Sequence, residues 1–173
     1  MTQFMGYRRS DGRVGVRNIV AVISAMDNTN ACANRISDIV AQAVPITTPF
    51  GRTQIGHDFE MTLRTLAGIG AHPNVAAVLV LGLSLASANA LADRIRPSGK
   101  PVEVLGLQEA GSTMGLTMAG VRVAADLTVA ASEQVREPCD FADLTVAVEC
   151  GGSDTTSGIA SNPTVGLFAD RFI

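Results

Sequence analysis

Three continuous apolar runs constrain the fold of this chain more than any other feature of its sequence. The runs are Ile19–Ser24, Val75–Leu83 and Val102–Leu107, and each leads through a polar turn into a segment with helical periodicity. A strand that is covered on both faces has this composition, whereas a strand with one solvent-exposed face alternates polar and apolar residues. The sequence therefore predicts a mostly parallel sheet with helices on both faces.

Shorter patterns complete the alternation of strands and helices. We expect two further strands, Ile46–Thr48 and Leu144–Val148, and four helices, Ala31–Ala43, Asp58–Gly70, Ala88–Arg96 and Met114–Glu137. The result is an α/β fold of about five strands with right-handed crossovers, a Rossmann-like arrangement of three layers. Residues 1–16 are predicted to be a polar lead-in arm, and residues 17–173 a single α/β domain.

Charge and cysteine content exclude several classes of protein. The net charge is −3 and the 13 Lys and Arg residues are scattered, which argues against a nucleic-acid-binding surface. No apolar run reaches the ~18 residues that a membrane span needs, and the N-terminus lacks the apolar core of a signal peptide. Three cysteines without framework spacing indicate reduced thiols, so we expect a cytoplasmic protein. Neither Gly-x-Gly-x-x-Gly nor a P-loop follows any predicted strand, so nucleotide binding is not supported.

The segment from Val146 to Gly166 is predicted to carry the chemistry. Its strand leads into Cys150-Gly151-Gly152-Ser153-Asp154, and Asn162-Pro163 then begins a helix, with Asn162 as N-cap. A thiol, a carboxylate and free N–H groups thus gather beyond the carboxyl end of a strand, where open α/β sheets bind ligands. A tight strand-to-helix turn with a buried cysteine and a capping aspartate explains the same residues equally well.

Two other polar segments supply candidate site residues. Arg13 and Arg17 flank a turn in the lead-in and can clamp one anion, because arginine pairs with oxyanions through two hydrogen bonds. The alternative is a solvated arm that caps the sheet. In the loop Pro49–Asp58, Arg52 is a candidate anion contact and His57 a candidate base or ligand, unless His57 is an ordinary helix-start residue. Cys32 and Cys139 are interpreted as packing residues, and His72 as structural.

Three ordered motifs resemble the altronate and galactarate dehydratase family. They are Gly6–Asn18, His72–Leu83, and Cys150–Asp154 together with Ser157-Gly158 and Asn162-Pro163. Within the family, Pro49–Gly56 and Ser153–Gly158 are more similar to the large subunit of (2R)-sulfolactate sulfo-lyase. The sugar-acid dehydratases carry a Gly-Cys-Gly near Gln54 and a cysteine near Asn28, and this chain lacks both cysteines.

The resemblance implies a lyase that uses Fe(II) or another divalent metal to eliminate water or sulfite from a 2-hydroxy acid, either a sugar acid or sulfolactate. The product is a 2-keto acid. On this interpretation Cys150 and Asp154 lie at the metal, and Cys150, Asp154 and His57 are the catalytic candidates. The substrate-binding candidates are Arg13, Arg17, Arg52, Gly151, Gly152, Ser153 and Asn162.

The resemblance also implies partners and an alternative function. Family members continue past the Asn-Pro helix, so we expect a chain truncated relative to the family, with a small N-terminal domain or a separate small subunit as partner. We expect a homo-oligomer as well, because an incomplete α/β sheet leaves apolar surface. The alternative is a non-catalytic dimerisation or binding domain of such an enzyme. A hydrolase with Cys150 as nucleophile lacks a clear histidine partner.

Overall fold

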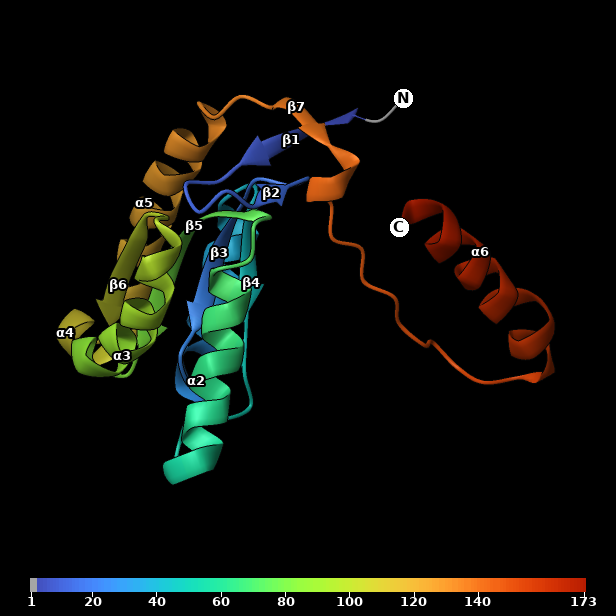
Figure 1. The fold of residues 1–173 in the computed structure, drawn as a ribbon. Coiled ribbons are helices and arrows are strands. Elements are labelled where there is room, and N and C mark those ends of the chain that lie inside the picture. Colours follow the sequence, from blue (N-terminus) through green and yellow to red (C-terminus); the bar gives the residue numbers. More distant parts are fainter. Residues whose placement is uncertain (1–2) are drawn as a thin grey trace.

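A four-stranded parallel sheet forms the centre of the computed structural model, which describes residues 3–173 (Figure 1). Its strand order is β4-β3-β5-β6, with bounds β3 (Ile19–Ser24), β4 (Ala43–Ile46), β5 (Val75–Gly82) and β6 (Val102–Gly106). Every residue of β5 is buried, as its continuous apolar composition predicts. The predicted strands at β3, β5 and β6 are confirmed.

The fourth strand begins before the predicted position. β4 covers Ala43–Ile46 rather than Ile46–Thr48, and it pairs in parallel with β3. The backbone of Thr48 is bound instead by the side chain of Asn30: Thr48 N donates to Asn30 Oδ1 at 3.2 Å, and Asn30 Nδ2 donates to Thr48 O at 2.8 Å. A side-chain amide thus replaces the strand ladder at this residue.

Helices cover both faces of the sheet, which confirms the predicted layers. On one face, α1 (Asn30–Ile39) and α5 (Thr113–Ser132) pack on β3 and β5 through a cluster that includes Ile36, Leu79 and Leu116. On the other face, α2 (Gly56–Gly70) and α3 (Leu85–Ile95) pack on β3 and β5 through a second cluster of buried apolar side chains. The short α4 (Leu107–Ala110) follows β6. Burial of both faces supplies the main driving force for this arrangement.

Among the described residues, α5 is the one helix that is long and apolar enough to cross a bilayer by length and composition. Leu116, Gly120, Ala124 and Leu127 form a buried stripe along it. A Cβ at Gly120 would overlap the side chain of Ile36 on α1, so the two helices approach closely at this point. The apolar composition of α5 therefore follows from its position on the sheet.

A second, antiparallel sheet covers the amino-terminal edge of the parallel one. Its order is β2-β1-β7, with β1 (Gln3–Arg8), β2 (Val14–Gly15) and β7 (Glu137–Asp140). The lead-in therefore contains two strands, and the pairing of β7 with β1 explains why the helix predicted to reach Glu137 ends at Ser132. Cys139 is buried between these strands and Cys32 against the main sheet, as packing residues.

Beyond the turn at Phe141–Asp143 the chain extends away from the two sheets, and none of residues 141–173 is buried (Figure 1). They contain a 3-10 turn (Phe141–Asp143), a π-helical turn (Ser157–Ser161) and α6 (Asn162–Phe172). The prediction of a buried strand at Leu144–Val148 is wrong: the segment is extended, and Val148 is 70% exposed. Its backbone has no strand beside it within residues 3–173, and a strand needs such a neighbour to satisfy its N–H and C=O groups.

Candidate active site

The strand order creates a ligand-binding position at the carboxyl edge of the sheet. The chain passes from β3 to β4 on one side and then to β5 on the other, so the crossovers diverge between β3 and β5. Such a switch point leaves a crevice beyond the strand ends, where open α/β sheets bind ligands. The loops after β3 and β4 meet here, and Asp27 N donates to Phe50 O at 3.0 Å.

Arg52 lies at this edge, as an anion contact would require. Its Nη2 and Nε donate to Asp27 Oδ2 at 2.7 and 3.1 Å. The Arg52 side chain is 66% exposed while that of Asp27 is 24% exposed, so the carboxylate orients a guanidinium that still faces solvent. The remaining N–H groups of Arg52 are free to bind a carboxylate or sulfonate.

Two acceptor atoms in the turn after β3 lack partners. Asp27 Oδ1 and Asn28 Oδ1 are buried and accept no hydrogen bond within the described residues. Buried polar atoms are nearly always paired in proteins, so an unpaired one indicates a missing water, ion or ligand. Of these two oxygens, Asp27 Oδ1 belongs to the carboxylate that orients Arg52. In the sequence, Asp27 and Asn28 are marked only as part of a polar turn after a strand.

The loop that carries Arg52 has an unusual backbone. Gly51 has φ +110°, and a Cβ there would overlap Met26 in the loop after β3. Thr53 has φ +59°, which is rare for a β-branched residue. Gln54 Oε1 holds the turn by accepting from Gly51 N at 3.1 Å and Thr62 Oγ1 at 2.9 Å. Strained backbone of this kind concentrates at functional sites.

His57 follows in the first turn of α2 and is exposed. No hydrogen bond orients its side chain within residues 3–173, unlike that of Arg52. The structure thus places His57 at the same edge of the sheet as Arg52 but leaves its role as a base a prediction.

The Cys150 loop lies in the exposed C-terminal segment. Cys150, Gly151, Gly152 and Asn162 line one hollow of about 800 Å³ there, so these four predicted residues are brought together. Cys150 is exposed, against the expectation of a buried thiol in the tight-turn alternative. Arg52 and His57 belong to other elements, α2 and the loop before it, and do not line this hollow.

Asp154 caps a helix. Its Oδ1 accepts from Thr156 Oγ1 at 2.5 Å, Thr156 N at 2.7 Å and Ser157 N at 3.1 Å. These hydrogen bonds, led by that of the Thr156 side chain, lower the pKa of the Asp154 carboxyl. The interpretation of Asp154 as a cap is confirmed, whereas that of Asn162 as N-cap is wrong, because the helical path already begins at Thr155.

Residues 3–173 do not by themselves form a centre for a divalent metal. Within residues 3–173 no group of three or more His, Cys, Asp and Glu side chains is placed to hold an ion. Zinc takes about four ligands and the hard divalent cations about six, so Cys150 and Asp154 alone leave the shell incomplete. Their role as metal ligands stays a prediction.

Arg13 and Arg17 lie at the opposite edge of the sheet from Arg52. Arg13 Nη2 donates to Asp11 Oδ2 at 2.7 Å and to Ala71 O, at the end of α2, at 2.7 Å. The hydrogen bond from Arg13 lowers the pKa of the Asp11 carboxyl. The two edges are roughly 20 Å apart, because β3 has six residues and a strand rises about 3.3 Å per residue. One small acid therefore cannot contact Arg13 and Arg52 of the same chain.

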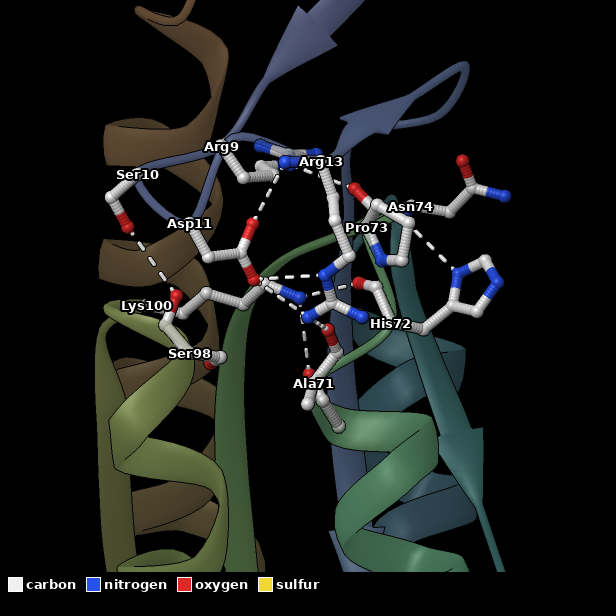
Figure 2. Close-up of polar contacts among 11 residues, drawn as sticks. Arg9, Ser10, Asp11, Arg13, Ala71, His72, Pro73, Asn74, Ser98 and Lys100 are labelled. Carbon is white, nitrogen blue, oxygen red and sulfur yellow. Dashed lines mark hydrogen bonds and ion pairs between the residues drawn. The ribbon is translucent and has the colours of Figure 1, made fainter. Parts of the chain in front are cut away.

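Two buried cations near Arg13 were missed in the sequence (Figure 2). Arg9 Nε donates to Pro73 O at 2.7 Å, and Lys100 Nζ donates to the carbonyls of His72 and Gly70. Each residue is only 8% exposed. Burial, followed by the charges of Arg9 and Arg13, lowers the pKa of Lys100 to about 8. The available signal was that Lys100 is the single lysine of the chain.

These features define the class of protein: an α/β domain whose polar loops enclose the switch point of a parallel sheet, as in many enzymes of small-molecule metabolism. The chain belongs to the D-galactarate and altronate dehydratase family. Residues 6–132 match the family described as D-galactarate dehydratase/Altronate hydrolase, second domain, and residues 141–173 match D-galactarate/Altronate dehydratase, C-terminal. The resemblance predicted from the three motifs is confirmed.

Curated relatives align with nearly the whole chain. The (2R)-sulfolactate sulfo-lyase subunit beta of Chromohalobacter salexigens is 43% identical over 168 residues, which cover 97% of this chain and 43% of that protein. The altronate dehydratase of Bacillus subtilis is 32% identical over 182 residues, covering 98% and 36%. The galactarate dehydratase (L-threo-forming) of Escherichia coli is 25% identical over 196 residues, covering 98% and 37%. The chain thus spans about two fifths of the length of these lyases and dehydratases.

Proposed function

We propose that this chain is the part of a lyase that binds a 2-hydroxy acid at the carboxyl edge of its parallel sheet. The arrangement at Asp27 carries the proposal, since its carboxylate orients Arg52 and the turn that holds it has two unpartnered buried acceptors, Asp27 Oδ1 and Asn28 Oδ1. An α-hydroxy acid offers the complementary groups, an anion for the guanidinium and a hydroxyl donor for the acceptors. The reaction would eliminate water or sulfite and give a 2-keto acid.

The elimination needs a base and a way to hold the acid group while the proton beside it leaves. In the proposal, Arg52 binds that acid group. His57, in the first turn of the helix that follows the Arg52 loop, is the candidate base. The glycines of the predicted N–H donor loop, Gly151 and Gly152, line a separate hollow in the exposed C-terminal segment, so they are not part of the site at Arg52 in this chain. Fe(II) or another divalent metal belongs to the proposal only if ligands beyond Cys150 and Asp154 come from outside residues 3–173.

Sulfolactate is the substrate we favour. The relative named for sulfolactate is 43% identical, against 32% and 25% for the sugar-acid dehydratases above. That relative is named as a subunit beta, which supports a separate small subunit as partner. A homo-oligomer and a cytoplasmic location complete the proposal. A non-catalytic binding or dimerisation domain is the second candidate, favoured by the exposed, incomplete donor set at Cys150.

The test uses the full-length gene product, with its small subunit if there is one, prepared anaerobically with ferrous iron. Sulfolactate, altronate and galactarate would each be supplied, and 2-keto acid and sulfite measured. We expect keto acid and sulfite from sulfolactate. Keto acid from a sugar acid alone would overturn the substrate assignment, and full turnover by Cys150→Ser would favour the second role for the C-terminal loop.

Arg52→Gln tests the carboxyl-edge site directly. Removing a charge-assisted pair costs about 1.5–3 kcal/mol, so kcat/KM should fall roughly 10–100-fold. Arg64→Gln is the matched control, because Arg64 is an exposed arginine further along α2. Equal kcat/KM in the two variants would contradict the placement of the substrate at Arg52.

A further inference from the structure

A small polar cavity lies at the amino edge of the sheet, on the far side from the proposed active site. Its volume is about 190 Å³, and its lining includes Arg8, Arg9, Ser10, Lys100 and Gln134. These residues come from the lead-in, the loop before β6 and the segment after α5. We propose that this cavity binds a small oxyanion, either a carboxylate or a tetrahedral phosphate- or sulfate-like group. The proposal is independent of the activity proposed above.

The charge balance of the cavity wall is positive. Arg9 and Lys100 are each 8% exposed, and neither forms an ion pair with a carboxylate of residues 3–173. Arg8 is already paired, with Glu137 at 2.7 Å and Asp143 at 3.1 Å. Buried charges are normally compensated, since desolvation without a partner is expensive. An anion would supply that compensation.

Arg9 retains donors for such an anion. Its Nε, Nη1 and Nη2 donate to Pro73 O, Gln134 Oε1 and Arg17 O at 2.7, 2.8 and 3.0 Å. A guanidinium has a second N–H on each Nη, so two donors remain in the plane of the fork. The Tyr7 ring packs against this guanidinium. The centroid of the ring lies 5.5 Å from Arg9 Cζ and 5.1 Å from Arg136 Cζ.

Capping of α2 accounts for only part of this positive charge. Lys100 Nζ donates to the carbonyls of Gly70 and His72, and Arg13 donates to that of Ala71, which lie at the end of the helix. The negative end of a helix dipole is equivalent to about half a charge. Asp11, which also raises the pKa of Lys100, is shared with Arg13. Burial is the largest cause of the lowering of that pKa to about 8, and the charges of Arg9 and Arg13 lower it further.

Gln134→Glu is the sharpest variant for a test. Its carboxylate would keep the shape of Gln134 and its bond to Arg9, while neutralising the guanidinium and repelling an incoming anion. Gln108→Glu is the matched control, because it makes the same change after β6, at the other edge of the sheet. Isothermal titration with inorganic phosphate, and separately with acetate, would be run on the full 173-residue chain in chloride of matched ionic strength.

We expect about one equivalent of phosphate or acetate to bind, with affinity reduced roughly 10-fold or more in Gln134→Glu and unchanged in Gln108→Glu. Binding of phosphate alone would assign a tetrahedral anion, and binding of acetate a carboxylate. Lys100→Met should also weaken binding, with circular dichroism showing that the variant is folded. No binding beyond the chloride control, or equal affinity in the two glutamate variants, would overturn the proposal.

Discussion

Arginine side chains at the two ends of the parallel sheet are held in different ways. Arg52 is paired with one carboxylate and remains 66% exposed, so its interaction with Asp27 contributes ~0–1 kcal/mol and leaves the guanidinium available. Arg9 is buried and bound to three side-chain or backbone oxygens, so it is part of the framework. Residue type alone does not distinguish these roles; burial and the choice of partner do.

Gly51→Ala should destabilise the fold and displace the Arg52 loop. The new Cβ would meet Met26 and the carbonyl of Ala25 at a backbone φ of +110°, so strain and overpacking add to roughly 2–4 kcal/mol. Gly12→Ala is the control: its φ is +85°, but nothing lies within 4 Å of the new Cβ, and we expect a loss of about 1 kcal/mol. Urea unfolding of both variants measures the difference, and equal losses would contradict the close approach at Gly51.

The elements of the chain differ in how firmly they are held. The loops after β3 and β4 are joined by Asp27, Asn30 and Thr48, and their strands lie in the core. Residues 141–173, by contrast, bury no side chain, although α6 brings Phe168 and Phe172 together with ring centroids 5.3 Å apart. An element that buries little apolar surface adds little to global stability and opens easily.

Truncation after Asp143 tests this division. We expect a chain of residues 1–143 to unfold cooperatively with a free energy within roughly 1 kcal/mol of that of the full chain, because β7 and the core remain intact. Limited proteolysis of the full chain should cut first between residues 144 and 154, which form an extended, exposed segment. A large loss of stability, or first cleavage inside α2 or α5, would show that the C-terminal segment packs on the body.

At the scale of the whole molecule, the parallel sheet separates two polar regions of different character. The carboxyl edge carries exposed, oriented groups, whereas at the amino edge the lead-in, the end of α2 and the start of β6 are tied together by Arg9, Arg13 and Lys100 (Figure 2). The first arrangement suits an exchanging ligand. In the second, the ammonium group of Lys100 is bound to carbonyl oxygens at the end of α2.

The stability of the molecule should therefore rise with pH above about 8. The folded pKa of Lys100 is about 8 against 10.5 for a free lysine, so between these values the unfolded chain binds more protons than the folded one. The free energy of unfolding then increases with pH across this range and levels off above 10.5. Burial lowers this pKa most, Arg9 and Arg13 lower it further and Asp11 raises it, while the nearby His72 accepts a hydrogen bond from Lys100 through its carbonyl.

Urea unfolding from pH 7 to 10.5 in chloride buffer would measure this dependence. Lys100→Met is the reference, because every other ionisable group is present in both proteins. The free energy of unfolding of the wild-type protein minus that of Lys100→Met should rise with pH. A flat or falling difference would contradict the depressed pKa of Lys100.

The layers of this fold and its family were determined by the sequence alone. β3, β5 and β6 lie where apolar runs predict them, because burial of a strand on both faces depends mainly on the composition of that strand. Cys139 and Asp154 likewise act locally, as a packing residue and a cap. Ordered motifs identified the family, since short sequences carry that information without any knowledge of contacts.

Only the tertiary structure decided which polar residues share an edge. The sequence suggested one set of arginines, but β3 separates Arg13 from Arg52, and Asp11 and Ala71 already occupy Arg13. It also suggested a strand at Leu144–Val148 and an unpaired lead-in, whereas the lead-in pairs with β7 and the predicted strand pairs with nothing in residues 3–173. Periodicity reports the environment of a segment, while pairing and charge compensation depend on partners far along the chain.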